Sequence, residues 1–286
     1  MIVDYHMHLR GSVAAGPEPL VHTVAAIERF VEVAAARGVD EIGFTEHDYY
    51  FRQTREVWRT GYQLERCLFD LDDYVGAVVE AKRQGLPVKL GIEVDWWLGG
   101  NERLHELLAP YPWDYLLGSV HWVDDLAIDF EPGLWAVRPV DDVWRGYGAA
   151  VSDLARSGLV DVLAHPDLAK VFGRRPSAAV LHEVQEQIVA AAVAGGCAVE
   201  ISTAGLHKPV GELYPSPELL SACCRAGVPL TLASDAHVPE NVGRDFAAAL
   251  ELAGVAGYET VTVFEARVAR QEPLGPLVPR GARVPA

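Results

Sequence analysis

Strand-like apolar stretches alternate with helix-like stretches about seven times along this chain, and this alternation restricts its fold more than any other feature. Apolar residues recur at helical spacing between the strands. Strands joined through helices run parallel, so the pattern predicts an α/β barrel or a doubly wound sheet. The predicted strands are 3–5, 41–45, 88–94, 114–120, 160–164, 197–202, 229–233 and 259–264, and the helices are 20–38, 70–85, 101–108, 141–157, 177–194, 217–226 and 241–253.

Histidines and acids gather at the carboxyl ends of these strands. In an open sheet those ends would be spread along an edge, whereas in a closed barrel they meet at one face, where chemistry is done. The pattern therefore favours closure into a single barrel. Six of the ten histidines and two acids share this position: His6, His8, His47, His121, His165, His237, Glu93 and Asp235.

These side chains are typical ligands of a divalent metal. His6 and His8 are two residues apart, so on an extended chain both imidazoles point to one face. Imidazole and carboxylate without thiolate suit Zn²⁺, Fe or Mn²⁺. Glu93, central among the strands, is placed to bridge two ions. The four cysteines form no CxxC pair and are interpreted as reduced core thiols.

The other four histidines carry weaker signals. His22, His105 and His182 fall on predicted helices, and we expect structural or solvent-facing roles for them. His207 follows a strand end, which makes it a candidate for contact with substrate.

Length and charge limit the classes of function. The chain has 286 residues, and one α/β barrel typically takes about 250. We expect one catalytic domain over residues 1–271 and a proline-rich tail over 272–286.

No signal peptide precedes the first strand, and the apolar run 188–199 is too short to span a bilayer, so we expect a cytoplasmic protein without a membrane partner. A net charge of −16 disfavours nucleic acid. A phosphorylated substrate would need local cations, and a homo-oligomer remains open.

Seven short motifs in one order and spacing resemble the PHP family of metal-dependent phosphoesterases, and most of all its branch of histidinol-phosphate phosphatases. The resemblance implies an α/β fold, a distorted (β/α)₇ barrel, with a trinuclear metal centre. It runs from Val3 to about Phe246 and rests on DYHMH (4–8), FTEHD (44–48), GIEVD (91–95), GSVHW (118–122), LAHPDL (163–168), STAG (202–205) and SDAHVPENVG (234–243).

The resemblance also implies a ligand set. His6, His8, Glu93 and Asp235 would hold one ion, Glu93, His121 and His165 a second, and His47 and His237 a third.

A further histidine is expected after the first motif, but residues 9–20 contain none, and His22 lies on a predicted helix. Two hypotheses follow. Either a third ion binds through His47, His237 and water, or it is absent and Arg10 supplies the positive charge.

The implied reaction is hydrolysis of a phosphate monoester by water that the ions activate, with L-histidinol phosphate as the first candidate substrate. Asp235, His47 and His237 are the candidate catalytic residues, the two histidines as donors of a proton to the leaving oxygen if the third site is empty. An aromatic segment, residues 49–59, could cover a flat substrate group. The residues expected to bind substrate are Arg10, Arg52, Arg55, Arg174, Arg175, His207 and Lys208.

Two other hypotheses about the function stay open. The same site could act on a nucleotide, a sugar phosphate or a phosphodiester. Alternatively, the chain could be a non-catalytic module that binds metal for stability.

Overall fold

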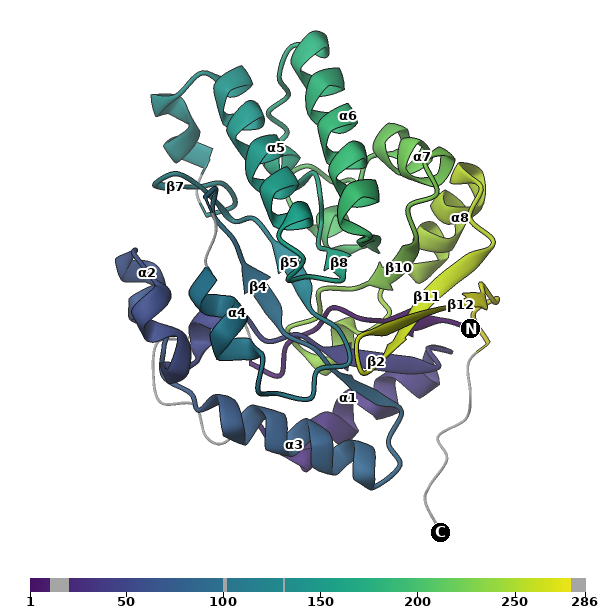
Figure 1. Cartoon of the computed structure of the whole chain (residues 1–286). Helices are drawn as coiled ribbons and strands as arrows, with labels where there is room; N and C mark the ends of the chain where they lie inside the picture. Colours follow the sequence, from purple (N-terminus) through teal and green to yellow (C-terminus); the bar gives the residue numbers. More distant parts are fainter. Residues whose placement is uncertain (11–20, 100–101, 131, 279–286) are drawn as a thin grey trace.

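The structure, a computed structural model, describes residues 1–10, 21–99, 102–130 and 132–278 (Figure 1). Parallel strands occupy the centre, with α1 and α3 packed on one side and α5 and α6 on the other. Within the described residues, none of the helices has the length and apolar character that crossing a membrane requires. All four cysteines are free thiols, and three of them are buried.

The parallel strands form two sheets. The first has the order β1-β2-β3, and the second has the order β10-β9-β8-β5-β4. Their bounds are β1 Val3–Asp4, β2 Glu41–Phe44, β3 Val88–Leu90, β4 Glu93–Asp95, β5 Leu117–Ser119, β8 Val162–Leu163, β9 Ala198–Ser202 and β10 Leu230–Ala233.

Backbone hydrogen bonds join the two sheets on both sides. Next to β1, the amide of Tyr5 donates to the carbonyl of Leu232 on β10, at 2.9 Å. Beyond β2, the amide of Glu93 donates to the carbonyl of Glu46, at 3.0 Å. The predicted strand 88–94 is therefore interrupted: its first half pairs with β2, and its second half begins the other sheet.

The predicted helices are present, with shifted ends. Side chains at the N-termini explain several starts: Thr23 accepts a hydrogen bond from the amide of Ala26, and Ser216 accepts one from the amide of Leu219. The helices are α1 Val24–Ala36, α2 Gly61–Leu64, α3 Leu71–Arg83, α4 Glu102–Leu108, α5 Val140–Arg156, α6 Ala178–Gly195, α7 Pro217–Arg225 and α8 Phe246–Ala256, with 3₁₀ turns at Asp48–Tyr50, Arg52–Val57, Pro132–Val137, Leu168–Lys170, Ala204–His207 and Pro239–Asn241.

Two antiparallel hairpins contain strands that were not predicted. One consists of β6 Trp122–Val123 and β7 Leu126–Ala127, and it begins directly after His121. The other pairs β11 Thr260–Glu265, which was predicted as a last strand, with β12 Val268–Pro273. Strand β12 thus continues two residues beyond the predicted domain boundary at 271.

Buried tyrosines fix the strands beneath the site. The hydroxyl of Tyr74 donates to the carbonyls of Phe44 and Gly91, at 2.8 and 2.7 Å. The hydroxyl of Tyr115 donates to the carbonyl of Tyr5 at 2.6 Å and crosses the face of β2. A Cβ atom on Gly43 would lie only 2.1 Å from that hydroxyl, so this position requires glycine.

Candidate metal centre

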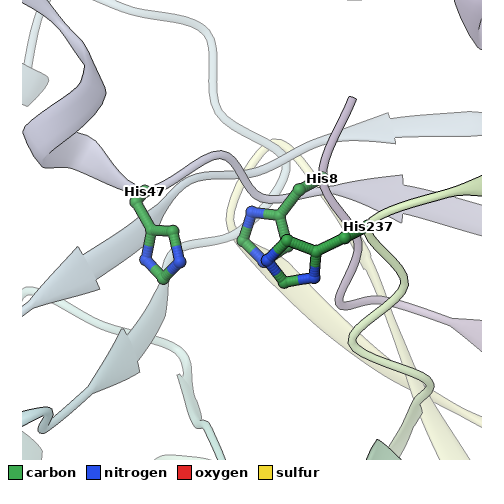
Figure 2. A group of neighbouring side chains, drawn as sticks. All are labelled: His8, His47 and His237. Atoms are coloured by element: carbon green, nitrogen blue, oxygen red, sulfur yellow. The ribbon is translucent and has the colours of Figure 1, made fainter. Parts of the chain in front are cut away.

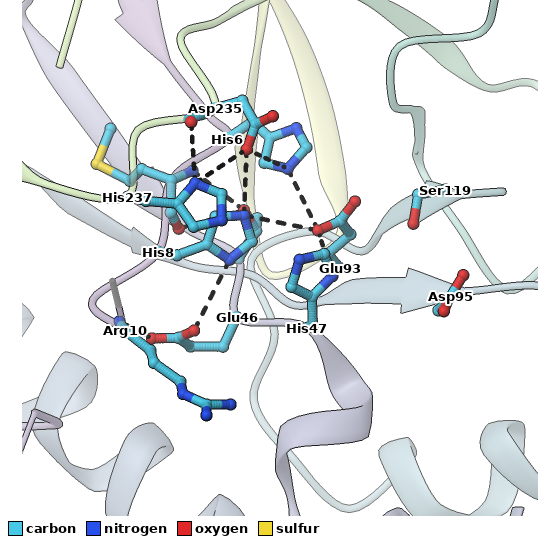
Figure 3. Close-up of polar contacts among 12 residues, drawn as sticks. His6, His8, Arg10, Glu46, His47, Glu93, Asp95, Ser119, Asp235 and His237 are labelled. Carbon is cyan, nitrogen blue, oxygen red and sulfur yellow. Dashed lines mark hydrogen bonds and ion pairs between the residues drawn. The ribbon is translucent and has the colours of Figure 1, made fainter. Parts of the chain in front are cut away.

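Glu93 lies at the centre of a cluster of imidazoles at the carboxyl ends of the strands (Figure 3). Its Oε2 atom lies 2.8 Å from Nδ1 of His47, 3.4 Å from Nε2 of His6 and 3.6 Å from Nε2 of His8. Its Oε1 atom lies 3.5 Å from Nε2 of His165 and 3.7 Å from Nε2 of His121. One carboxylate thus faces five imidazoles from four different strand ends.

Asp235 closes the cluster on the side of β10. Its Oδ1 atom lies 3.5 Å from Nε2 of His8, 3.7 Å from Nε2 of His6 and 3.5 Å from Nδ1 of His237. It has a positive φ of 51°, a backbone conformation that a residue other than glycine keeps only when its surroundings hold it there. The structure therefore brings together all eight residues that we expected to bind metal.

The imidazoles of His8, His47 and His237 also lie near one another (Figure 2). The ring centroid of His8 is 4.6 Å from that of His47 and 4.3 Å from that of His237. Within the described chain, four overlapping groups could each hold an ion, because their ligand atoms lie within 4.8 Å of one another: His6–His8–Asp235, His6–Glu93–His165, His47–Glu93–His121 and His8–His47–His237.

The donor set fits divalent ions. In the described part of the chain, Nε2 of His6, Nε2 of His8 and both carboxylate oxygens of Glu93 are buried and have no hydrogen-bond partner. Buried polar atoms normally have partners, so several unpartnered atoms that point at one another indicate a missing ligand. Nitrogen and carboxylate oxygen without sulfur are suitable donors for Zn²⁺, Mn²⁺ and Fe.

Buried carboxylates hydrogen-bond two of these imidazoles from behind, and a third carboxylate lies near another imidazole. Nδ1 of His6 lies 3.1 Å from both oxygens of Glu200 on β9, and Nδ1 of His121 lies 3.2 Å from Asp95 on β4. Glu46 lies 3.7 Å from Nδ1 of His8. Carboxylates in this position fix the tautomer and leave the opposite Nε2 free to bind a metal.

These charges shift the pKa values in opposite directions. Burial lowers the pKa of His8, but Asp235, Glu46 and Glu93 outweigh it and raise that pKa to about 9. Burial would raise the pKa of Glu93, but the surrounding imidazoles, His47 first, hold it well below its usual value. His237 differs, because burial and then the neighbouring His8 lower its pKa to about 4.

The sequence suggested that His22 lies on a helix. In the structure it instead precedes α1. Its ring packs against Phe51, Phe69 and Tyr74, and its Nε2 lies 3.3 Å from Glu46. Its side chain is buried, and among the residues that the structure describes it belongs to no candidate metal group. Most of the loop expected to supply another ligand, residues 11–20, lies outside the described residues.

A cavity of about 230 Å³ opens onto the cluster. Six of the candidate ligands line it, together with tyrosines of the aromatic segment. The full lining is His47, Tyr49, Tyr50, Tyr62, Glu93, His121, Trp122, Ala127, Asp129, Phe130, His165, Lys208, Asp235 and His237.

Of the seven residues expected to bind substrate, Lys208 alone lines this cavity. Arg10 turns away from the cluster, and its guanidinium carbon lies 4.2 Å from the ring centroid of Tyr50 (Figure 3). The structure thus offers no support for Arg10 as a charge near the ions.

The other five lie elsewhere. Three pair with nearby acids: Arg52 with Asp70, Arg175 with Glu212 and His207 with Asp245. Arg55 donates to the carbonyl of Leu64, and Arg174 is exposed.

Comparison with known proteins identifies the family. Residues 4–204 match the PHP domain, so the chain belongs to the PHP domain family. A Deinococcus radiodurans protein named "Probable histidinol-phosphatase" is 33% identical over 270 residues, which cover 91% of this chain and 96% of that protein. A Lactococcus lactis histidinol-phosphatase is 22% identical, over 92% of this chain and 94% of its own.

Solved structures show the same fold. The crystal structure of histidinol phosphate phosphatase from Lactococcus lactis, in complex with zinc, L-histidinol and phosphate, superimposes with a TM-score of 0.71. It is 22% identical in sequence, and the superposition covers 94% of this chain and 98% of that one. The predicted α/β class and the PHP resemblance are therefore confirmed.

Proposed function

We propose that this protein is a metal-dependent phosphatase that hydrolyses L-histidinol phosphate to L-histidinol and phosphate in the cytoplasm. The observation that carries the proposal is the position of Glu93, whose two oxygens face five imidazoles at the floor of an open cavity. The names of the relatives point to the same substrate. The small volume of the cavity favours a small ester.

We infer that the two sheets close into one distorted (β/α)₇ barrel that forms a single catalytic domain. The bonds from Tyr5 to Leu232 and from Glu93 to Glu46 support closure, because they connect the sheets on both sides. Closure would also explain how residues as distant in sequence as His6 and His237 share one cluster.

We propose that the cluster holds at least two divalent ions, Zn²⁺, Mn²⁺ or Fe, through His6, His8, Glu93, His121, His165 and Asp235. Ions bound there supply an activated water and neutralise charge on the phosphoryl group. Glu200 and Asp95 keep His6 and His121 in the tautomer that presents Nε2 to an ion. Glu93 and Asp235 remain ionised, because the imidazoles hold their pKa values low.

We also propose a third ion, bound by His47, His237 and water. A pKa of about 4 leaves His237 neutral at pH 7, which favours a role as ligand over a role as proton donor. Burial likewise lowers the pKa of His47. This proposal takes up the first of the two hypotheses for the third site. The orientation of Arg10 away from the cluster counts against the second.

Phosphate release tests the proposal directly. Purified protein loaded with Zn²⁺ or Mn²⁺ should release phosphate from L-histidinol phosphate faster than from nucleotide or sugar phosphates. His165→Ala should abolish turnover, because its imidazole faces Glu93. The matched control is His182→Ala, which removes an exposed histidine on α6 and should leave activity unchanged. A loaded protein without turnover on any ester would refute the proposal and support a non-catalytic module.

A further inference from the structure

One wall of the cavity is aromatic and consists of residues that are not candidate metal ligands. The ring centroid of Tyr62, from α2, lies 6.0 Å from that of Trp122 on β6 and 5.7 Å from that of Phe130. All three residues line the cavity, and Phe130 is 58% exposed. Exposed aromatic rings at the mouth of a polar cavity provide a surface on which a flat or cationic group can stack.

Asp129 stands beside this wall, immediately after the β6–β7 hairpin. Its side chain lines the cavity, yet within the described residues it belongs to none of the groups that could hold a metal and makes no ion pair. The other two carboxylates of the lining, Glu93 and Asp235, are surrounded by imidazoles. Asp129 is thus the one acid of this lining that is available to a ligand.

Among the residues that the structure describes, Lys208 is the single lysine or arginine that lines the same cavity. A free carboxylate, an aromatic wall and one cation beside a metal cluster are unsuited to an ester that carries only negative charge, because Asp129 would repel it. They suit a phosphate ester whose alcohol part carries a positive charge and a ring.

We propose that Asp129 determines specificity by accepting a hydrogen bond from the ammonium group of the substrate, while the ring of that substrate packs on Tyr62, Trp122 and Phe130. The inference rests on the proposed function and deepens it, because it assigns recognition of an amino-alcohol phosphate to residues outside the metal centre. The ligand class is a phosphate monoester with an ammonium group two carbons from the ester oxygen.

The test compares two esters and two variants. Asp129→Asn keeps the shape of the side chain and removes its charge. Asp125→Asn is the matched control, because Asp125 lies in the turn of the neighbouring β6–β7 hairpin, is largely exposed, pairs with Arg138 and does not line the cavity. Each zinc-loaded protein is assayed on L-histidinol phosphate and on imidazolylpropyl phosphate, which lacks the amino group.

A hydrogen bond to a charged group contributes enough to change kcat/KM by about ten- to one-hundred-fold. We expect Asp129→Asn to lower kcat/KM by that factor on L-histidinol phosphate and by less than about two-fold on the des-amino ester. Asp125→Asn should match the parent on both. An equal loss on both esters, or no loss on either, would overturn the assignment.

Binding of L-histidinol tests the role of Asp129 independently of turnover. If the parent protein turns over no ester, the proposed function fails, and titration calorimetry of L-histidinol into zinc-loaded protein then decides the role of Asp129. Weaker binding to Asp129→Asn than to Asp125→Asn would support the inference. Equal binding to the two variants, or no binding to the parent, would refute it.

Discussion

Replacement of Glu200 by glutamine should weaken metal binding without disturbing the fold. Glu200 is fully buried, and its two oxygens lie 3.1 Å from Nδ1 of His6, while its Oε1 also accepts the backbone amide of His165 at 2.9 Å. Glutamine has the same shape and can still accept both hydrogen bonds with its one oxygen. Its amide group, however, brings a donor to within contact of Nδ1 and removes the negative charge that makes His6 a stronger ligand.

The expected magnitude follows from this geometry. Loss of a carboxylate behind a ligating histidine typically costs about 10- to 100-fold in metal affinity, which corresponds to about 1.4 to 2.7 kcal/mol. Zinc affinity is measured by competition with a chromogenic chelator. Glu251→Gln, on the exposed face of α8, is the control and should bind zinc like the parent.

The stability of the metal-free proteins shows whether Glu200 mainly orients His6 or mainly stabilises the core. The thermal unfolding midpoint of metal-free Glu200→Gln should stay close to that of the metal-free parent. Unchanged zinc affinity in this variant would refute the reasoning. A large fall in the metal-free midpoint would show instead that Glu200 acts mainly in the core.

Three further outcomes follow from the structure. Gly195→Ala should lower the free energy of unfolding in urea by about 1–3 kcal/mol, because the new Cβ would lie 1.8 Å from the carbonyl oxygen of Ala155. Gly254→Ala, which meets no atom within 4 Å on α8, should be neutral or stabilising by up to about 1 kcal/mol. Lys208→Ala should raise KM for the phosphate ester and lower kcat/KM about ten-fold at unchanged metal content, in a steady-state assay with metal analysis.

The ligand cluster was predictable because parallel strands present their carboxyl ends on one face. His6, Glu93 and Asp235 all follow strand-like stretches, so their convergence required no tertiary information beyond the direction of the strands. Glu200 was missed, although it carried a signal. It is the one charged residue within the apolar strand 197–202, and a charged residue is rarely buried unless it is paired.

Other features depend on contacts that no local pattern reveals. Helical periodicity near Val21 placed His22 on a helix, although Thr23 has the preferred character of a residue that precedes one. Asp129 lies in a loop without periodicity. The arginines were candidates only by their place in the chain, and their partners, such as Asp70 for Arg52, come from distant segments.

The metal content of Glu93→Gln tests the central claim most directly. After equilibration with Zn²⁺ and removal of free metal, elemental analysis of the parent should find at least two ions per chain. Glu93→Gln should retain its secondary structure by circular dichroism but lose most of this metal, because its carboxylate faces all five imidazoles. A folded Glu93→Gln protein that holds as much zinc as the parent would contradict the account.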